Sequence, residues 1–281
     1  MLFPENIGED LSIDEVSLSH GDLFTFITNK KGRAKKGTLV ASIKGTLTSD
    51  IIQVIEKLPL SSRESVKEVT LDMAKNMESA VKTGFPCADL VTDRFHVVKL
   101  VIDALQHVRI KHRWEELDKE NKAIEKAKKQ GVKYKQAVFE NGDSPKQLLA
   151  RCRYILAKKP TDWTPNQKQR AGILFREYPM IETAYKHTLE FRNIYENKTL
   201  ITAKETLENW IQKSFKQEIK EFYTAANSIQ NNMGNILNFF NNRNTNANAE
   251  SFNSKIKLFR ANLRGVTDPT FFLFRLHKLF A

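Results

Sequence analysis

The chain has 281 residues, of which 41% are hydrophobic and 28% are charged, and it contains 18 Phe. This apolar content is enough for a packed core and excludes a wholly disordered or collagen-like chain. The balance of 45 Lys and Arg against 33 Asp and Glu gives a formal charge of +12. Because an excess of basic residues attracts polyanions, nucleic acid is the first partner class to consider and an anionic membrane surface the second. An ordinary basic, solvated surface is the plain alternative.

The cysteine content and the N-terminal sequence indicate the cellular compartment. Cys87 and Cys152 are too few for a disulfide framework and have no neighbours at zinc-ligand spacing, so a reducing compartment is expected. Residues 1–16 are acidic and lack an apolar segment, and no uninterrupted apolar run in the chain approaches about 18 residues. We therefore expect a cytoplasmic protein that neither spans nor binds a membrane.

Short apolar runs separated by turn residues fill the N-terminal third, which is the pattern of a β-sheet. The expected strands cover residues 11–19, 22–29, 37–45, 66–72 and 88–93. Short helices are expected between the third and fourth strands and between the fourth and fifth. Hairpins join antiparallel strands and helical crossovers join parallel ones, so we expect three antiparallel strands followed by parallel ones.

From residue 94 to about 240 the apolar residues repeat with the helical period, and no β-rich run interrupts them. The sequence therefore predicts three parts, which are residues 1–100, an all-helical part at 101–240, and residues 241–281. Between Gln106 and Lys135 the chain has ten Lys and Arg against five Asp and Glu, which indicates a basic helical face. The alternative is a solvated helix with ion pairs between successive turns.

A helix is expected around Glu250, because apolar residues recur there at steps of three and four. Its apolar stripe consists of Phe252, Ile256, Phe259 and Leu263. Its polar face carries Glu250, Asn253, Ser254 and Lys257. A carboxylate in the first turn could also serve only to complement the helix dipole.

Three other acids lie within or at the ends of expected strands: Asp14, Asp72 and Asp93. The apolar positions of the first strand change from odd to even at Asp14-Glu15, which we interpret as a local irregularity. Any of these acids alone could be an N-cap or a surface charge. Together with Glu250, however, carboxylates from two strands and a helix suffice for two hard cations such as Mg²⁺, which prefer oxygen ligands and catalyse displacement at phosphorus. No zinc cluster or glycine-rich phosphate loop competes with this interpretation.

Four segments carry a family resemblance: LSIDEVSLSHGDLFTFITN, VTLDMAKN, DLVTDRFHVVKLV and NRNTNANAESFNSKIKLFRANLRGV. They resemble the insertion-sequence transposases of the ISL-three family, particularly its ISAon-type branch, in order and over essentially the whole chain. The resemblance implies an α/β ribonuclease-H-like catalytic domain with a DDE triad. Residues 1–100 and 241–281 would form this domain, and the large all-helical insertion at 101–240 would interrupt it.

The resemblance also implies roles for single residues. Asp14, Asp72 and Glu250 match the three catalytic acids and would bind Mg²⁺ or Mn²⁺, as two ions. Asp93 and His96 match a DxxH element that supports the site, and Asp93 is the alternative to Asp72 as the second acid. The expected phosphate contacts are Lys255, Lys257, Arg260 and Arg264, with ordinary surface charge as the alternative.

The implied activity is DNA transposition, in which a phosphodiester is hydrolysed at the element's ends and the freed 3′-OH is joined to target DNA. The alternative is an inactive remnant that acts as a basic DNA-binding or assembly protein. Full-length members carry a zinc-binding and helix-turn-helix region ahead of the core, and this region is not found here. We therefore expect either a separately encoded N-terminal DNA-binding polypeptide or a truncated gene. A homo-oligomer associated with the bacterial nucleoid is also expected.

Overall fold

The computed structural model describes residues 1–17, 23–243, 247–262 and 268–281. The chain forms two compact units. Met1–Val97 and Asn232–Ala281 make up the first, which we call the sheet unit, and Val98–Asn231 make up the second, which we call the helical unit.

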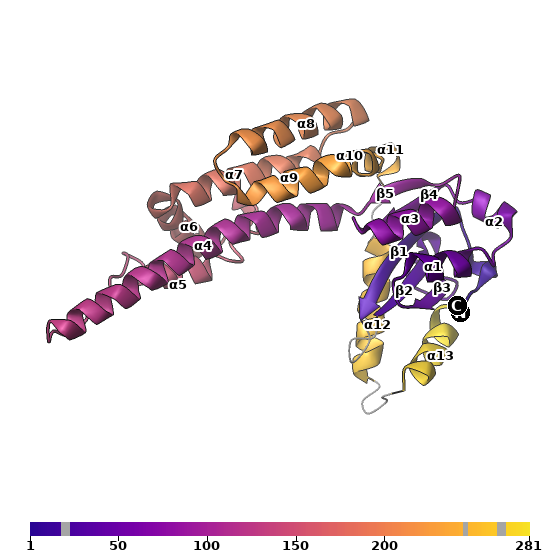
Figure 1. The fold of residues 1–281 in the computed structure, drawn as a ribbon, viewed down its shortest axis with the longest axis horizontal. Coiled ribbons are helices and arrows are strands. Elements are labelled where there is room, and N and C mark those ends of the chain that lie inside the picture. Colours follow the sequence, from indigo (N-terminus) through magenta and orange to yellow (C-terminus); the bar gives the residue numbers. More distant parts are fainter. Residues whose placement is uncertain (18–22, 244–246, 263–267) are drawn as a thin grey trace. The chain divides into compact units, whose positions relative to one another are not determined.

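The sheet unit is built on five strands in the order β3-β2-β1-β4-β5 (Figure 1). Their bounds are β1 Asp10–Ser17, β2 Leu23–Asn29, β3 Leu39–Lys44, β4 Glu68–Leu71 and β5 Asp89–Thr92. β1 pairs antiparallel with β2, and β2 pairs antiparallel with β3. β4 is parallel to both β1 and β5. The five expected strands and their directions are thus confirmed, while residues 18, 19 and 22 of the first two expected strands lie outside the described residues.

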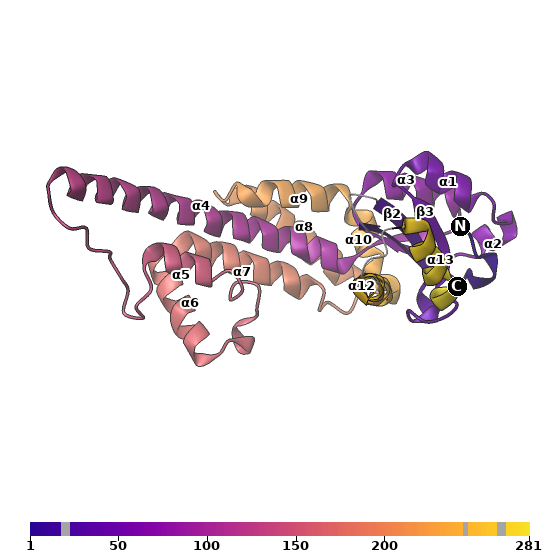
Figure 2. The same cartoon turned by 90° about the horizontal axis from the view of Figure 1, so that it is seen from below.

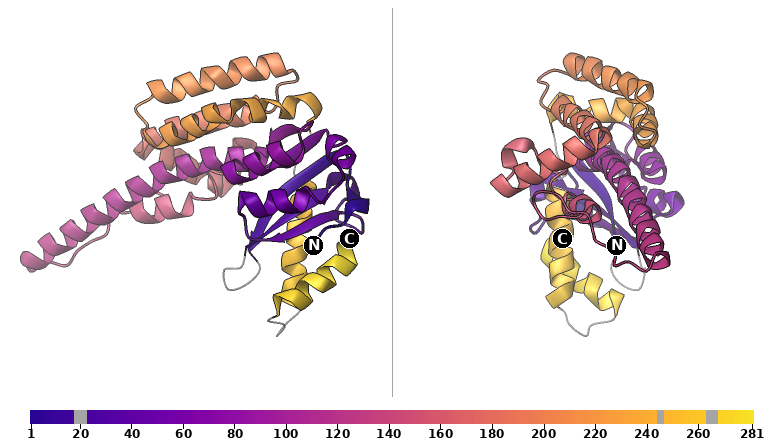
Figure 3. Two further views of the ribbon diagram at one scale, coloured as in Figure 1. Left: turned by 45° about the vertical axis from the view of Figure 1, so that its right-hand side comes forward. Right: turned by 90° about the vertical axis from the view of Figure 1, so that its left-hand side faces the viewer.

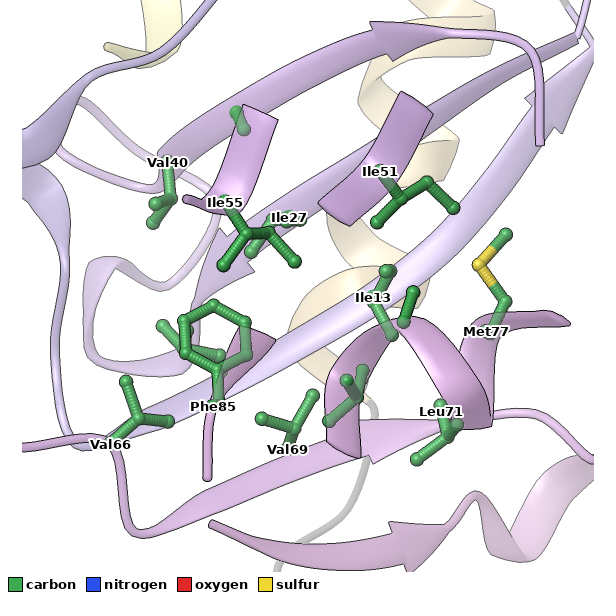
Figure 4. Packing of buried hydrophobic residues seen from close by; sticks show 14 of the residues in the cluster. Ile13, Ile27, Val40, Ile51, Ile55, Val66, Val69, Leu71, Met77 and Phe85 are labelled. Carbon is green, nitrogen blue, oxygen red and sulfur yellow. The ribbon is translucent and has the colours of Figure 1, made fainter. Parts of the chain in front are cut away.

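Helices cover both faces of this sheet (Figures 1 and 3). On one face α1 (Thr48–Ile55) and α3 (Lys75–Gly84) pack on the strands, and Figure 4 shows Ile51 of α1 and Met77 of α3 beside Ile13 of β1. The short α2 (Leu60–Glu64) follows α1 in the chain. On the other face α12 (Ala247–Asn262) and α13 (Pro269–Phe280) meet an aromatic cluster centred on Phe26.

β1 contributes side chains to both of these cores. Leu11 and Ile13 belong to the cluster under α1 and α3, whereas Val16 belongs to the cluster under α12 and α13. The pairing of β1 with β2 is unbroken from Leu11 to Ser17, so the expected irregularity at Asp14-Glu15 is wrong. The apolar positions change from odd to even because the two halves of the strand are buried on opposite faces.

Residues 94–240, all of which the structure describes, contain no strand, as the helical periodicity predicted. The helices that follow β5 are α4 Arg94–Lys129, α5 Pro145–Arg151, α6 Pro165–Glu177, α7 Pro179–Ile194, α8 Leu200–Lys216 and α9 Glu221–Asn231. In the sheet unit α10 (Met233–Leu237) and α11 (Phe239–Asn242) come next. α7, α8 and α9 lie side by side (Figures 2 and 3), and the His187 ring of α7 stacks on Trp210 of α8 at 4.6 Å. Within the described ranges, no helix is both long and apolar enough to cross a membrane.

A buried histidine connects α13 with the sheet. The His277 side chain lies 2.9 Å from the hydroxyl of Ser42, and its ring meets the Phe3 ring edge-on at 5.1 Å. Burial disfavours the charged imidazolium and lowers the pKa of His277 to about 4. The folded protein therefore holds this ring neutral at pH values where the unfolded chain already binds a proton.

The aromatic contact of α12 can be tested by truncation. The Phe252 ring is fully buried and meets Phe26 edge-on at 5.7 Å. Phe252→Ala removes this packing and leaves a cavity, so the free energy of unfolding should fall by about 3–5 kcal/mol. Leu258→Ala is the matched control, because Leu258 lies on the same helix and is 63% exposed. Urea unfolding measures both variants, and equal losses would contradict the assigned packing.

The buried His277 predicts a pH dependence of stability. A lowered pKa in the folded state contributes stability that is complete above about pH 6.5 and is lost as the pH falls toward 4. His277→Gln cannot take up this proton, so its unfolding free energy should depend less on pH, by up to about 1.4 kcal/mol per pH unit in that range. Urea unfolding at pH 7, 6, 5 and 4 tests the slope. Parallel curves for the two proteins would show that His277 is not held neutral.

Candidate active site

Three aspartates come together because three neighbouring strands run parallel. β1 and β4 pair with Ser12 opposite Thr70, so two residues further on Asp14 and Asp72 are next to each other on the same face. β4 and β5 pair with Leu71 opposite Thr92, which places Asp93 beside Asp72 at the same end of the sheet. All three acids belong to the sheet unit.

Asp14 is half-buried and is held by two hydrogen bonds. The backbone amide of Glu15 donates to one carboxylate oxygen (2.8 Å), and the side-chain amide of Asn253 on α12 donates to the other (2.6 Å). Burial raises the pKa of Asp14 above its usual value, and Asp72 raises it further, while the two hydrogen bonds and His96 oppose the rise. The site therefore concentrates negative charge where water is partly excluded.

Asp93 and His96 form a hydrogen-bonded pair at the start of α4. The buried Asp93 accepts from the backbone amide of Phe95 (3.2 Å) with one oxygen and contacts Nδ1 of His96 (3.0 Å) with the other. This contact raises the pKa of His96, and the nearby Asp14 and Asp72 add to the effect. The carboxylates around His96 therefore favour the protonated form of its ring.

Asp72 and Glu250 differ in their surroundings. Asp72 is half-buried and accepts a hydrogen bond from the backbone amide of Ala74 (2.8 Å) through one oxygen. Glu250 is exposed in the first turn of α12, one helical turn before Asn253. In the described part of the chain, no three His, Cys, Asp or Glu side chains stand close enough together to hold a metal ion. The structure thus places Asp14, Asp72 and Asp93 at one end of the sheet, with His96 paired to Asp93, whereas Glu250 is exposed on α12 and has no described contact with them.

The basic residues expected to contact phosphate lie along α12. Lys255 donates its ammonium group to the carbonyl oxygen of Ala34 (2.6 Å), which ties the helix to the turn after β2. Lys257 is exposed and Arg260 is partly exposed. Arg264 lies outside the described residues.

The donor set suits a hard cation. Carboxylate oxygens are the ligands that Mg²⁺ and Mn²⁺ prefer, and Asp14 and Asp72 supply them from adjacent strands. A divalent cation would also offset the burial and mutual repulsion that raise the pKa of Asp14. Two acids therefore fit such an ion, and a third ligand would have to come from a side chain such as Glu250.

The sequence does not by itself identify Asn253 as a site residue, although Asn253 and Glu250 are expected on the same polar face of one helix. The signal was the helical step of three between them. An uncharged amide was not weighed as a partner for an aspartate 239 residues earlier in the chain.

The role of Asn253 predicts a change in the ionisation of Asp14. Asn253→Ala removes a hydrogen bond that favours the carboxylate, so the pKa of Asp14 should rise further. Carbon-detected NMR titration of the aspartate carboxyl groups measures it directly. Ser254→Ala, at the exposed neighbouring position, is the control and should leave the titration unchanged. An unaltered Asp14 midpoint in Asn253→Ala would refute the contact.

Comparison with known proteins agrees with this geometry. A DDE transposase family profile of the ISL3 type, described as "Transposase", matches residues 11–276. The chain is also similar to the "Transposase for insertion sequence element IS1001" of Bordetella parapertussis, with 21% identity over 274 residues. That alignment covers 97% of this chain and 61% of the relative, so the chain spans about three fifths of the relative's length. The profile covers nearly the whole chain, and the protein therefore belongs to the ISL3 family of DDE transposases.

Proposed function

We propose that this chain is the catalytic part of a DNA transposase, which hydrolyses a phosphodiester at the ends of an insertion sequence and transfers the freed 3′-OH to target DNA. The observation that carries the proposal is the convergence of Asp14 and Asp72 on adjacent parallel strands in a member of a DDE family. A ribonuclease-H-like fold for the sheet unit is part of the proposal. Its support is the strand order β3-β2-β1-β4-β5, with three antiparallel strands followed by two parallel ones.

Asp14, Asp72 and Glu250 would hold the metal ions, Mg²⁺ or Mn²⁺. Asp72 is favoured over Asp93 as the second acid because it follows β4, the strand next to the β1 strand that carries Asp14, whereas Asp93 follows β5, one strand further away. Asp72 makes one described side-chain hydrogen bond, through one of its oxygens. Glu250 would close the site from α12, whose neighbouring turn already contacts Asp14 through Asn253.

The remaining groups would position DNA and the acids. When bound, two divalent ions supply an activated oxygen nucleophile and stabilise the leaving oxygen. Asn253 would fix the orientation of the Asp14 carboxylate. Asp93 would orient the His96 ring, whose nitrogens could donate to a phosphate oxygen. Lys257, Arg260 and Arg264 would contact the DNA backbone without reading its sequence.

The proposed partners are the element's ends and target DNA, which would place the protein at the nucleoid of a bacterial cytoplasm. Two DNA ends must be held together, so we propose a homo-oligomer. We also propose that a further DNA-binding region or polypeptide supplies recognition of the ends, because contacts to the DNA backbone do not read its sequence.

A second candidate is an inactive remnant that binds DNA without cutting it. One observation favours it, namely that Glu250 is exposed and that the acids of the described residues form no cluster of three that could hold a metal ion. Cleavage by the purified chain distinguishes the two functions.

The test is cleavage of a labelled duplex that carries the element's end, in the presence of Mg²⁺, of Mn²⁺ or of EDTA. Glu250→Gln and Asp14→Asn should each reduce nicking by roughly a hundredfold or more, the scale of losing one key electrostatic group in an active site. Because Glu250 is exposed, its substitution should change the free energy of unfolding by less than about 0.5 kcal/mol.

Glu205→Gln is the matched control, because Glu205 is an exposed glutamate on α8. It should cut DNA like the unaltered protein. DNA binding without metal-dependent cutting under every condition would reject the enzyme and leave the remnant. Unfolding of Glu250→Gln would show instead that this glutamate is structural.

A further inference from the structure

Basic side chains line a cavity of about 540 Å³ in the helical unit. One wall is a face of α4 between Asp103 and Trp114, and the other is Arg153, which follows α5. Three guanidinium groups meet here, those of Arg109, Arg113 and Arg153. The helical step of four between Arg109 and Arg113 places both on one side of α4.

Arg109 has a structural explanation. It is buried, and it donates to the side-chain oxygen of Gln106 (2.6 Å) and to the carbonyl oxygen of Leu149 (3.0 Å). Leu149 lies in the last turn of α5, where a cation complements the helix dipole. Arg109 therefore holds α5 against α4 and forms the floor of the cavity.

No comparable hydrogen bonds are described for the guanidinium groups of Arg113 and Arg153. That of Arg153 lies over the exposed ring of its neighbour Tyr154, 5.4 Å from the ring centroid. Neither arginine pairs with an acid of the described chain, and the Nε of Arg113 is buried without a hydrogen-bond partner. Elsewhere on α4 basic groups do find acids, as Lys99 does with Asp103 (2.5 Å) and Lys119 with Glu116 (2.7 Å). The first of these pairs also neutralises Asp103, an acid at the cavity wall.

The electrostatics of the cavity favour an anion. Burial lowers the pKa of Arg109, and the positive charges of Arg153 and Arg113 lower it further. Like charges gathered in a concave, partly dry site repel one another, and an anionic ligand reverses this cost. Guanidinium groups suit phosphate in particular, because their fork of donors matches its oxygens.

An aromatic ring stands beside these arginines. Trp114 lines the same cavity and is 60% exposed, so core packing does not account for it. Exposed indole and guanidinium planes are the surfaces on which unpaired bases stack. Bases within a duplex are already stacked on their neighbours, so this combination suits a single strand better than a double helix.

We infer that this cavity binds single-stranded DNA, with a phosphate against Arg113 and Arg153 and a base stacked on Trp114. The inference rests on the proposed function, since the helical unit would bind a strand of the DNA on which the sheet unit acts. It gives the basic face of α4 a defined ligand.

The test is binding of the full chain to a fluorescein-labelled oligothymidylate of about 12 nucleotides, a length within the usual range of such sites. Anisotropy is measured in EDTA, so that catalysis plays no part. Arg113→Gln with Arg153→Gln should raise the Kd about tenfold or more and lower the slope of log Kd against log salt by about 0.7, because one phosphate is no longer neutralised. Trp114→Ala should raise the Kd about fivefold to a hundredfold for the single strand and less than about twofold for a duplex of equal length.

Lys122→Gln with Lys126→Gln is the matched control, because it removes the same charge from exposed positions on the same helix. Its Kd should change less than about threefold. Arg153→Gln alone keeps the test valid if the half-buried Arg113 proves necessary for folding, since Arg153 is exposed.

Equal losses in the control and in the arginine pair would overturn the inference, as would equal effects of Trp114→Ala on single strand and duplex. The proposed function fails separately. If the chain binds single strands through this cavity but never cuts DNA, only the catalytic proposal is contradicted. If the variant without the cavity arginines still cuts DNA and binds single strands as before, only the single-strand inference is contradicted.

Discussion

The seating of α12 on the sheet through Phe252 is the contact on which the candidate site depends. The ring packs between Phe26 of β2 and Phe280 of α13, so one side chain joins a strand and both C-terminal helices. The next residue, Asn253, hydrogen-bonds Asp14, and Glu250 precedes it by one turn. The buried apolar stripe of α12 thus fixes the position of the helix on the sheet and its rotation about its own axis. As a consequence, Asn253 on its polar face lies next to Asp14.

The packing of α12 on the sheet also explains why the site lowers the stability of the fold. Covering both faces of the sheet partly excludes water from the end of β1, and the half-buried Asp14 is left beside the charge of Asp72. A carboxylate in such a place opposes folding unless hydrogen bonds or a cation compensate it. Asn253, the Glu15 amide and His96 supply part of that compensation. The fold gives up stability here for a concentration of acidic oxygens, which is common where a protein binds metal or substrate.

Much of this arrangement could be predicted from the sequence, because it follows from local patterns. Turn residues and short apolar runs located the five strands, and helical crossovers predicted the parallel pairs that align Asp14, Asp72 and Asp93. The supposed irregularity in β1 was wrong because periodicity alone does not show that a strand is buried on opposite faces along its length. The contact of Asn253 with Asp14 and the meeting of Arg153 with Arg113 depend on tertiary packing across 239 and 40 residues, which no local pattern encodes. The catalytic roles of the acids remain predictions.

The distance in sequence between β1 and α12 has a consequence for how the protein is made. A ribosome adds about 5–20 residues per second, so the 239 residues from Asp14 to Asn253 take roughly 12–48 seconds to synthesise. During that time β2, which carries Phe24 and Phe26, has left the ribosome, but the helices that cover it have not. The nascent chain therefore exposes an aromatic face of the sheet, to which chaperones can bind and on which other chains can aggregate. The acidic end of the sheet acquires its last neighbour only when synthesis is nearly over.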